Sequence, residues 1–132
     1  MTRSGTRKQS ILLVEDDEAL RALFTEVLDT AGFFVTAIRL AEDVPEVLRR
    51  NAPDLIVLDL VMPGGTMQGA ELLALLREAD AWKRLPVVIL SGYGGVVNRD
   101  IMTRLGAAAV LSKPLADLAI LPRTVRAILG AL

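Results

Sequence analysis

The sequence predicts an α/β fold, a doubly wound sheet of five parallel strands with helices packed on both faces. Short, continuously apolar runs of strand length recur along the chain, which is typical of strands covered on both faces. Segments with helical spacing of apolar residues lie between these runs, and this alternation builds a parallel sheet. The 132 residues contain no internal repeat, low-complexity tract or linker, so we expect a single domain.

The first half of the chain predicts three strands and two helices. The run at residues 11–14 is the first strand, and the helical spacing that begins at Asp17 ends at Gly32, a residue typical of helix C-termini. A second strand follows, and Pro45 suits the first turn of the short helix after it. The third strand is the apolar run that ends at Asp59. The expected strands are therefore residues 11–14, 33–38 and 55–58, and the expected helices are residues 17–31 and 41–50.

The second half predicts two strands and three helices. A loop with proline and glycine at residues 62–65 follows the third strand, and a glycine-bearing loop follows the fourth strand, which ends at Ser91. A weaker helix comes next, a short fifth strand ends before Lys113, and the apolar tail through Leu129 is helical. Because Pro122 lies in this tail, we expect either a kink or a helix that begins near Leu121. The expected strands are residues 86–90 and 108–111, and the expected helices are residues 69–79, 96–105 and the tail.

Composition excludes several classes of function. The chain has no cysteine and no histidine, so a disulfide framework, a thiol nucleophile, a Ser-His-Asp triad and a Cys- or His-ligated zinc site are all excluded. A net charge of −1 provides no positive field for a phosphate backbone, so we expect no direct binding of nucleic acid. No apolar run reaches the roughly 18 residues of a membrane span, and the start of the chain does not resemble a secretory signal. We therefore expect no membrane insertion and a cytoplasmic location.

Polar side chains stand where four of the expected strands end. Glu15 and Asp16 follow the first strand, Asp59 the third, Ser91 the fourth and Lys113 the fifth. Each one alone is ordinarily explained as a helix cap or a solvated charge. The carboxyl ends of parallel strands share one edge of the sheet, however, and this fold class binds ligands at that edge. Their convergence predicts a functional site.

Three carboxylates in one place need a compensating charge. At about 4 Å, each like-charged pair costs roughly 4 kcal/mol at an effective dielectric constant near 20. Either a carboxyl group takes up a proton or a hard cation binds, and ligands that are all oxygen favour Mg²⁺, with Mn²⁺ as the other candidate. Lys113 and Ser91 can contact an anion, so the set predicts a phosphoryl site. Asp16 suits a metal ligand, whereas Asp59, alone at the end of a central strand, is the better candidate nucleophile.

Four stretches carry a family resemblance. ILLVEDDE at 11–18, LIVLDLVMP at 55–63, VVILSGYG at 87–94 and LSKP at 111–114 occur in this order and closely resemble the receiver domain of two-component response regulators. The resemblance covers about residues 9–130. It implies the flavodoxin-like receiver fold with strand order 2-1-3-4-5, in which residues 9–132 form the receiver domain after a polar tail of residues 1–8.

Carried over position by position, the resemblance also implies roles for the site residues. Asp59 would be the phospho-acceptor. The implied metal ligands are Asp16, Asp59, Glu15 through water, and the backbone carbonyl of Val61. The implied phosphoryl contacts are Ser91 and Lys113, whose peptide bond to Pro114 is expected to be cis. Such a receiver catalyses its own phosphorylation and its own slow hydrolysis by positioning and charge stabilisation, and is not a turnover enzyme.

The implied donor is a phosphohistidine on a separate sensor histidine kinase or histidine phosphotransfer protein, because this chain has no histidine. Output would pass through contacts with a protein target that the sequence does not identify. Residues 96–132 carry five basic and two acidic side chains, either as a solvated face or as an interaction surface, and a homodimer through this C-terminal third is one such interaction. The alternatives are a phosphorylation-independent interaction module and a receiver excised from a larger regulator or hybrid kinase.

Three features depart from the family pattern. Val110 stands where many receivers carry a Tyr or Phe that turns inward, so we expect phosphorylation to be retained and the structural readout to be altered or dampened. Tyr93 is either a substitute moving ring or an exposed loop residue. The loop at residues 63–69 is about two residues longer than usual, which is either a tolerated insertion or a change to kinase docking and water access. Pro122 falls where the final helix of the family is usually unbroken.

Overall fold

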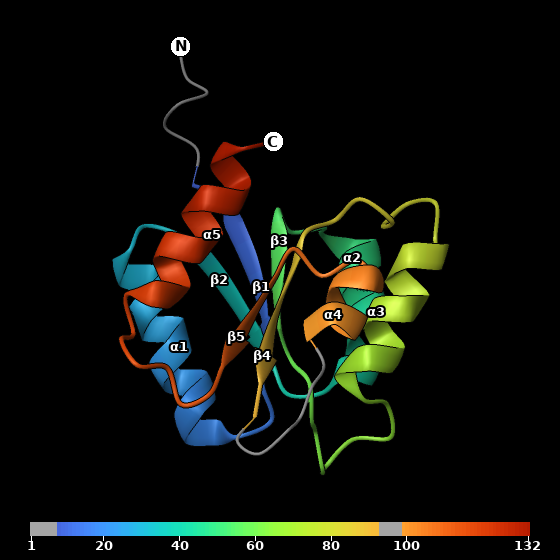
Figure 1. Ribbon diagram of the computed structural model, residues 1–132, viewed down its shortest axis with the longest axis horizontal. Helices are drawn as coiled ribbons and strands as arrows, with labels where there is room; N and C mark the ends of the chain where they lie inside the picture. The colour runs from blue at the N-terminus through green and yellow to red at the C-terminus, as the bar shows by residue number, and fades with distance from the viewer. Residues whose placement is uncertain (1–7, 93–98) are drawn as a thin grey trace.

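The protein forms a five-stranded parallel sheet with helices on both faces, in a computed structural model that describes residues 8–92 and 99–132 (Figure 1). The strand order is β2-β1-β3-β4-β5, and every neighbouring pair is parallel, as expected. The strands are β1 (Ser10–Val14), β2 (Phe34–Ile38), β3 (Leu55–Asp59), β4 (Val87–Ser91) and β5 (Ala109–Ser112). The helical elements are α1 (Glu18–Thr30), the 3₁₀ turn η2 (Ala41–Asp43), α2 (Val44–Arg50), α3 (Gly69–Glu78), α4 (Arg99–Arg104) and α5 (Ile120–Gly130).

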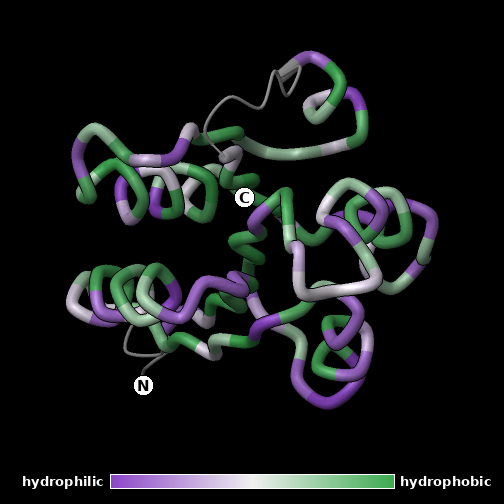
Figure 2. Tube along the Cα trace, turned by 90° about the horizontal axis from the view of Figure 1, so that it is seen from below, coloured by the Kyte–Doolittle hydropathy of each residue, from purple (hydrophilic) through white to green (hydrophobic). Residues whose placement is uncertain are grey.

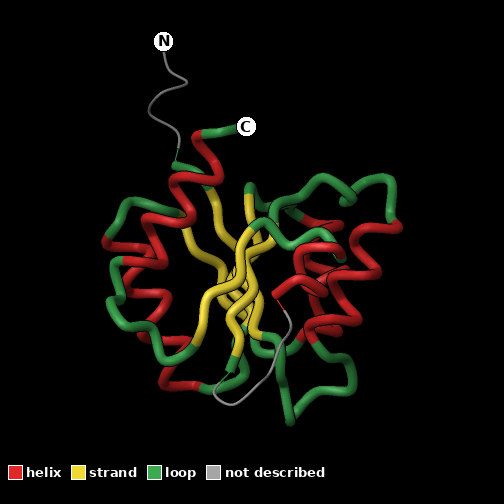
Figure 3. The backbone as a smooth tube through the Cα atoms, viewed as in Figure 1, coloured by secondary structure: helices red, strands yellow, loops and turns green. Residues whose placement is uncertain are grey.

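The sheet separates two hydrophobic cores. Helices α1 and α5 cover one face, and α2, α3 and α4 cover the other (Figures 1 and 3). In β1, Ile11 and Leu13 join the core under α1 and α5, whereas Leu12 and Val14 join the opposite core. Because both faces are covered, successive side chains of the central strands are buried, apart from the partly buried Ser10 at the start of β1, which explains why these strands are continuously apolar.

The ends of the helices follow local signals in the sequence. The Asp17 side chain accepts a hydrogen bond from the Leu20 N–H at 2.9 Å and so caps α1. Pro45 lies in the first turn of α2, as predicted. Helix α5 begins at Ile120, one residue before the expected start, so Pro122 lies in its first turn and does not interrupt it. A proline is tolerated there because the first turn has no intrahelical acceptor for its N–H groups.

Two expectations reach beyond the described residues. Helix α4 is described from Arg99, so its expected beginning at residue 96 lies outside the described part of the chain. Tyr93 lies outside it as well. Among the residues that the structure describes, no helix is both long enough and apolar enough to cross a membrane.

Candidate functional site

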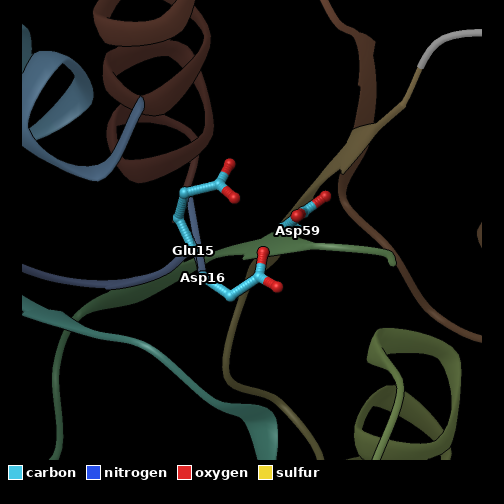
Figure 4. Close-up of side chains that lie close together, drawn as sticks. All are labelled: Glu15, Asp16 and Asp59. Atoms are coloured by element: carbon cyan, nitrogen blue, oxygen red, sulfur yellow. The ribbon is translucent and has the colours of Figure 1, made fainter. Parts of the chain in front are cut away.

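The carboxyl ends of the strands meet at one edge of the sheet, and the loops at this edge include hydrophilic stretches (Figure 2). Glu15 follows β1 and remains attached to the sheet, because its N–H donates to the Ile38 carbonyl at 3.1 Å. Asp59 is the last residue of the central strand β3. Figure 4 shows the carboxylates of Glu15, Asp16 and Asp59 close together. One oxygen of each lies within 4.8 Å of the others.

Lys113 completes the cluster from the end of β5. Its ammonium Nζ lies 3.0 Å from Glu15 Oε1 and 3.2 Å from Asp59 Oδ1. The backbone places it there, because the Lys113 N–H donates to the Ser91 carbonyl at 2.7 Å. The peptide bond to Pro114 is cis, as predicted. Residues separated by almost the whole chain thus form one ionic network.

Negative charge exceeds positive charge in this network. Glu15 and Asp59 are buried, with exposed fractions of 0% and 3%, so their charges are poorly solvated. The pKa of Glu15 is raised to about 7: burial is the largest cause, the hydrogen bond and charge of Lys113 oppose the rise, and the neighbouring Asp59 adds to it. Burial would lower the pKa of Lys113, but the hydrogen bond to Glu15 and the charges of Asp59 and Glu15 outweigh it and raise that pKa.

This imbalance means that one ammonium group cannot neutralise three carboxylates. The site either holds a proton near neutral pH or attracts a further cation. Carboxylate oxygens without histidine or cysteine are the ligands of hard divalent ions, so the donor set fits Mg²⁺. The ordinary explanation of Asp16 as a helix cap does not apply, because Asp17 is the cap of α1.

The structure also locates the two remaining predicted residues. Ser91 is buried at the end of β4, next to Leu90, which pairs with Asp59 across the sheet. Val61 lies two residues beyond Asp59, at the start of the β3–α3 loop, and its side chain is exposed. The structure therefore brings Glu15, Asp16, Asp59 and Lys113 into direct proximity and places Ser91 and Val61 on the adjoining strand and loop.

Three further residues shape this edge, and the sequence did not single them out. Arg21 Nη1 donates to the Glu15 carbonyl at 3.0 Å and so anchors the acidic turn to α1. The Gln68 side chain bonds both the N–H and the carbonyl of Met62. The Glu42 carboxylate accepts bonds from the loop residue Thr66, through its N–H and its hydroxyl group. Each bonds wholly or partly to backbone groups, which every residue carries, so residue type alone could not reveal the contact.

An apolar hollow of about 420 Å³ adjoins the cluster between α1 and the segment after β5. Lys113 and Pro114 line it on one side, and Leu20 and Leu23 of α1 line it on the other. The Leu23 side chain is 37% exposed.

Comparison with known proteins gives a consistent result. A family model described as the response regulator receiver domain matches residues 11–124. The chain is 39% identical over 122 residues to the response regulator protein FleR of Pseudomonas aeruginosa, an alignment that covers 92% of this chain and 25% of FleR. It is 34% identical over 107 residues to an uncharacterized 14.6 kDa protein of Leptolyngbya boryana, covering 81% of this chain and 80% of that protein.

Solved structures agree with these relatives. A putative response regulator from Chloroflexus aurantiacus superimposes with a TM-score of 0.85 and 27% identity, over 94% of this chain and 99% of that one. The receiver domain of NtrX from Brucella abortus superimposes with a TM-score of 0.84 and 26% identity, over 92% of this chain and 99% of that domain.

Proposed function

Because this chain belongs to the response regulator receiver domains of two-component systems, we propose that it accepts a phosphoryl group on Asp59 from a partner phosphohistidine. Receiver domains of response regulators are phosphorylated by sensor histidine kinases, and they generally bind Mg²⁺ at an acidic pocket. The donor here would be such a kinase or a histidine phosphotransfer protein. The receiver unit would be residues 9–132, after a tail of residues 1–8.

The observation that carries the proposal is the buried network of Glu15, Asp59 and Lys113 at the ligand-binding edge of the sheet. Asp59 is the residue we assign as acceptor, because it ends the central strand and lies 3.2 Å from the one ammonium group in the network. Asp16 and Asp59 would ligate the metal directly, Glu15 would act through water, and the Val61 carbonyl would be the remaining protein ligand. When bound, Mg²⁺ would supply positive charge that offsets the carboxylates and the incoming phosphoryl oxygens.

The transfer itself follows from these positions. An Asp59 carboxylate oxygen attacks phosphorus, the bond between phosphorus and the histidine nitrogen of the donor breaks, and the electron pair leaves with the imidazole. Lys113 then exchanges its contact with Asp59 for a phosphoryl oxygen, and the Ser91 hydroxyl donates a hydrogen bond to another. No general base is required, because the carboxylate is already the nucleophile.

The readout of phosphorylation would differ from the common pattern. Val110 is partly buried and packs against the core under α2, α3 and α4, and it has no ring that could turn inward. Hydrogen bonds to charged groups contribute about 1.5–3 kcal/mol each, so Ser91 and Lys113 would supply much of the roughly 5.5 kcal/mol that a complete two-state shift needs. We therefore propose that phosphorylation is retained and its structural readout dampened.

The chain spans about a quarter of FleR and of the transport regulator DctD of Pseudomonas aeruginosa. The activities of those longer proteins are therefore not assigned to it. The proposal covers the phospho-accepting step and signalling through protein contacts, with the downstream target left unassigned.

The test is incubation with Mg²⁺ and acetyl phosphate, followed by intact mass measurement. Wild type should gain one phosphoryl group, Asp59→Asn should gain none, and a chelator should abolish the gain. Asp17→Asn is the matched control, because Asp17 is a neighbouring acid that caps α1 instead of facing the cluster. No gain in wild type would favour an interaction module that works without phosphorylation. Equal gain in Asp59→Asn would show that another residue is the acceptor.

A further inference from the structure

We infer that Gln68 is a positioning residue for the magnesium site, because its side-chain amide fixes the peptide group that carries the Val61 carbonyl. Val61 follows the acceptor strand closely, and its carbonyl is a metal ligand only if that peptide group is turned the right way. The inference rests on the proposed function, in which the Val61 carbonyl is a ligand. It adds the residue that holds this ligand in place.

The chain is fixed as far as Leu60. The Leu60 N–H donates to the Leu90 carbonyl at 3.0 Å, and the Leu60 carbonyl accepts from the Gly69 N–H at 3.0 Å. Gly69 also lies so close that a Cβ added to it would stand 2.6 Å from the Asp59 carbonyl oxygen. The start of α3 is thus pressed against the end of β3. Val61 is the first residue after this double anchorage, so its own peptide group needs a separate restraint.

Gln68 supplies that restraint. The Met62 N–H donates to Gln68 Oε1 at 2.8 Å, and Gln68 Nε2 donates to the Met62 carbonyl at 3.1 Å. The Met62 N–H and the Val61 carbonyl belong to the same peptide group. Within the described residues, the cis peptide bond is the one between Lys113 and Pro114, so the Val61–Met62 group is trans. Since N–H and C=O point in opposite directions in a trans peptide, a Met62 N–H held by Gln68 turns the Val61 carbonyl to the opposite side.

Gln68 is itself held in place. Its backbone N–H donates to Glu71 Oε1 at 3.0 Å, which ties it to the first turn of α3. The Met62 carbonyl has a second donor, the Gly65 N–H at 3.0 Å, so it stays bonded if Gln68 is replaced. Replacing Gln68 therefore removes mainly the hydrogen bond that orients the Val61 carbonyl.

The chain offers a matched control in the same loop. Glu42 accepts bonds from the N–H groups of Thr66 and Met67 and from the Thr66 hydroxyl, at 2.9–3.3 Å. It holds the middle of the loop but does not touch the Val61–Met62 peptide group. Gln68→Met keeps the length of the side chain and removes the amide, whereas Glu42→Ala loosens the loop and leaves the amide in place.

The experiment is a Mg²⁺ titration of wild type, Gln68→Met and Glu42→Ala. Calorimetry measures the affinity, and NMR of isotope-labelled protein monitors the Val61 carbonyl carbon and the Met62 amide. Loss of a group that orients a metal ligand ordinarily weakens metal binding by about 10- to 100-fold, and we expect a loss of that size in Gln68→Met. Glu42→Ala should bind close to wild type. The Val61 carbonyl signal should shift on Mg²⁺ binding in wild type and in Glu42→Ala, and should shift much less in Gln68→Met.

A second variant guards against a folding defect. Gln68→Glu keeps an acceptor for the Met62 N–H, so the Val61 carbonyl signal should still respond to Mg²⁺; absence of that response would contradict the inference. If wild type binds Mg²⁺ and Gln68→Met binds it equally well, or both loop variants weaken equally, Gln68 is not the positioning residue. A wild type that binds no Mg²⁺ would overturn the proposed function and this inference with it.

Discussion

Two partly buried cations lie at opposite ends of the parallel strands, one at the edge of the sheet where the strands end and one at the edge where they begin. We call these the carboxyl edge and the amino edge. The two cations have different partners. Lys113 at the carboxyl edge contacts the carboxylates of Glu15 and Asp59. Arg77, at the end of α3, donates to three backbone carbonyls at the amino edge, those of Trp82, Leu85 and Gly106, at 2.8–3.3 Å. Neutral carbonyls accept the hydrogen bonds of Arg77, and none of these contacts involves a carboxylate. The acids around Lys113 outnumber it, and this surplus is what distinguishes a site that can bind a ligand from one that only joins loops.

The largest expected effect comes from breaking the Arg77 contacts. Arg77→Met leaves three carbonyls without their charged donor, and each hydrogen bond to a charged group contributes about 1.5–3 kcal/mol. We expect the free energy of unfolding to fall by about 4.5 kcal/mol in urea denaturation, the low end for three such bonds, while phosphorylation of Asp59 by acetyl phosphate persists. Arg77→Lys keeps the charge but not the planar guanidinium group, so its free energy of unfolding should lie between those of wild type and Arg77→Met. Normal stability together with abolished phosphorylation would contradict the assignment of Arg77 to structure alone.

The next largest effect is a pH dependence of stability that originates in Glu15. In the unfolded chain its carboxyl group loses the proton near pH 4.5, whereas in the folded protein the proton is held to about pH 7. Between these values the folded state binds more protons, so the free energy of unfolding falls as pH rises, by about 3 kcal/mol in total. Lys113 does not alter this window, because its raised pKa lies above the range.

Chemical denaturation at several pH values checks this expectation. Glu15→Gln should flatten the profile between pH 4.5 and 7, and saturating Mg²⁺ should flatten it in wild type by favouring the ionised carboxylate. Glu42 provides an internal contrast. Hydrogen bonds from Thr66 lower the pKa of Glu42, so its contribution is present above its ordinary pKa and is lost as pH falls. A wild-type profile that rises from pH 4.5 to 7 would contradict the assigned state of Glu15.

The comparison also shows what the sequence could and could not predict. Strands were predictable because both faces of the sheet are covered, and the cluster followed because parallel strands end at one edge. The contacts of Arg77, Arg21 and Gln68 were not predictable, because they involve backbone groups brought close by the tertiary fold. Of the two expectations for Pro122, a kink or a helix that begins near Leu121, the structure fits the second, because α5 begins at Ile120. A proline in the first turn of a helix costs no hydrogen bond.

The smallest expected effect concerns Gly106, and it tests how rigid the Arg77 contacts are. Gly106 has a φ of 101°, and a Cβ added there would lie 2.5 Å from Arg77 Nε. The positive φ alone costs a side chain about 1–2 kcal/mol, and displacing the bonded guanidinium adds to it. Gly106→Ala should therefore destabilise wild type by more than it destabilises Arg77→Met, whose side chain is free to move aside. A double-mutant cycle by urea denaturation measures the difference. Additive effects would mean that the Arg77 side chain moves aside for the new Cβ without loss of stability. Its contacts with the three carbonyls would then not hold the amino edge rigid.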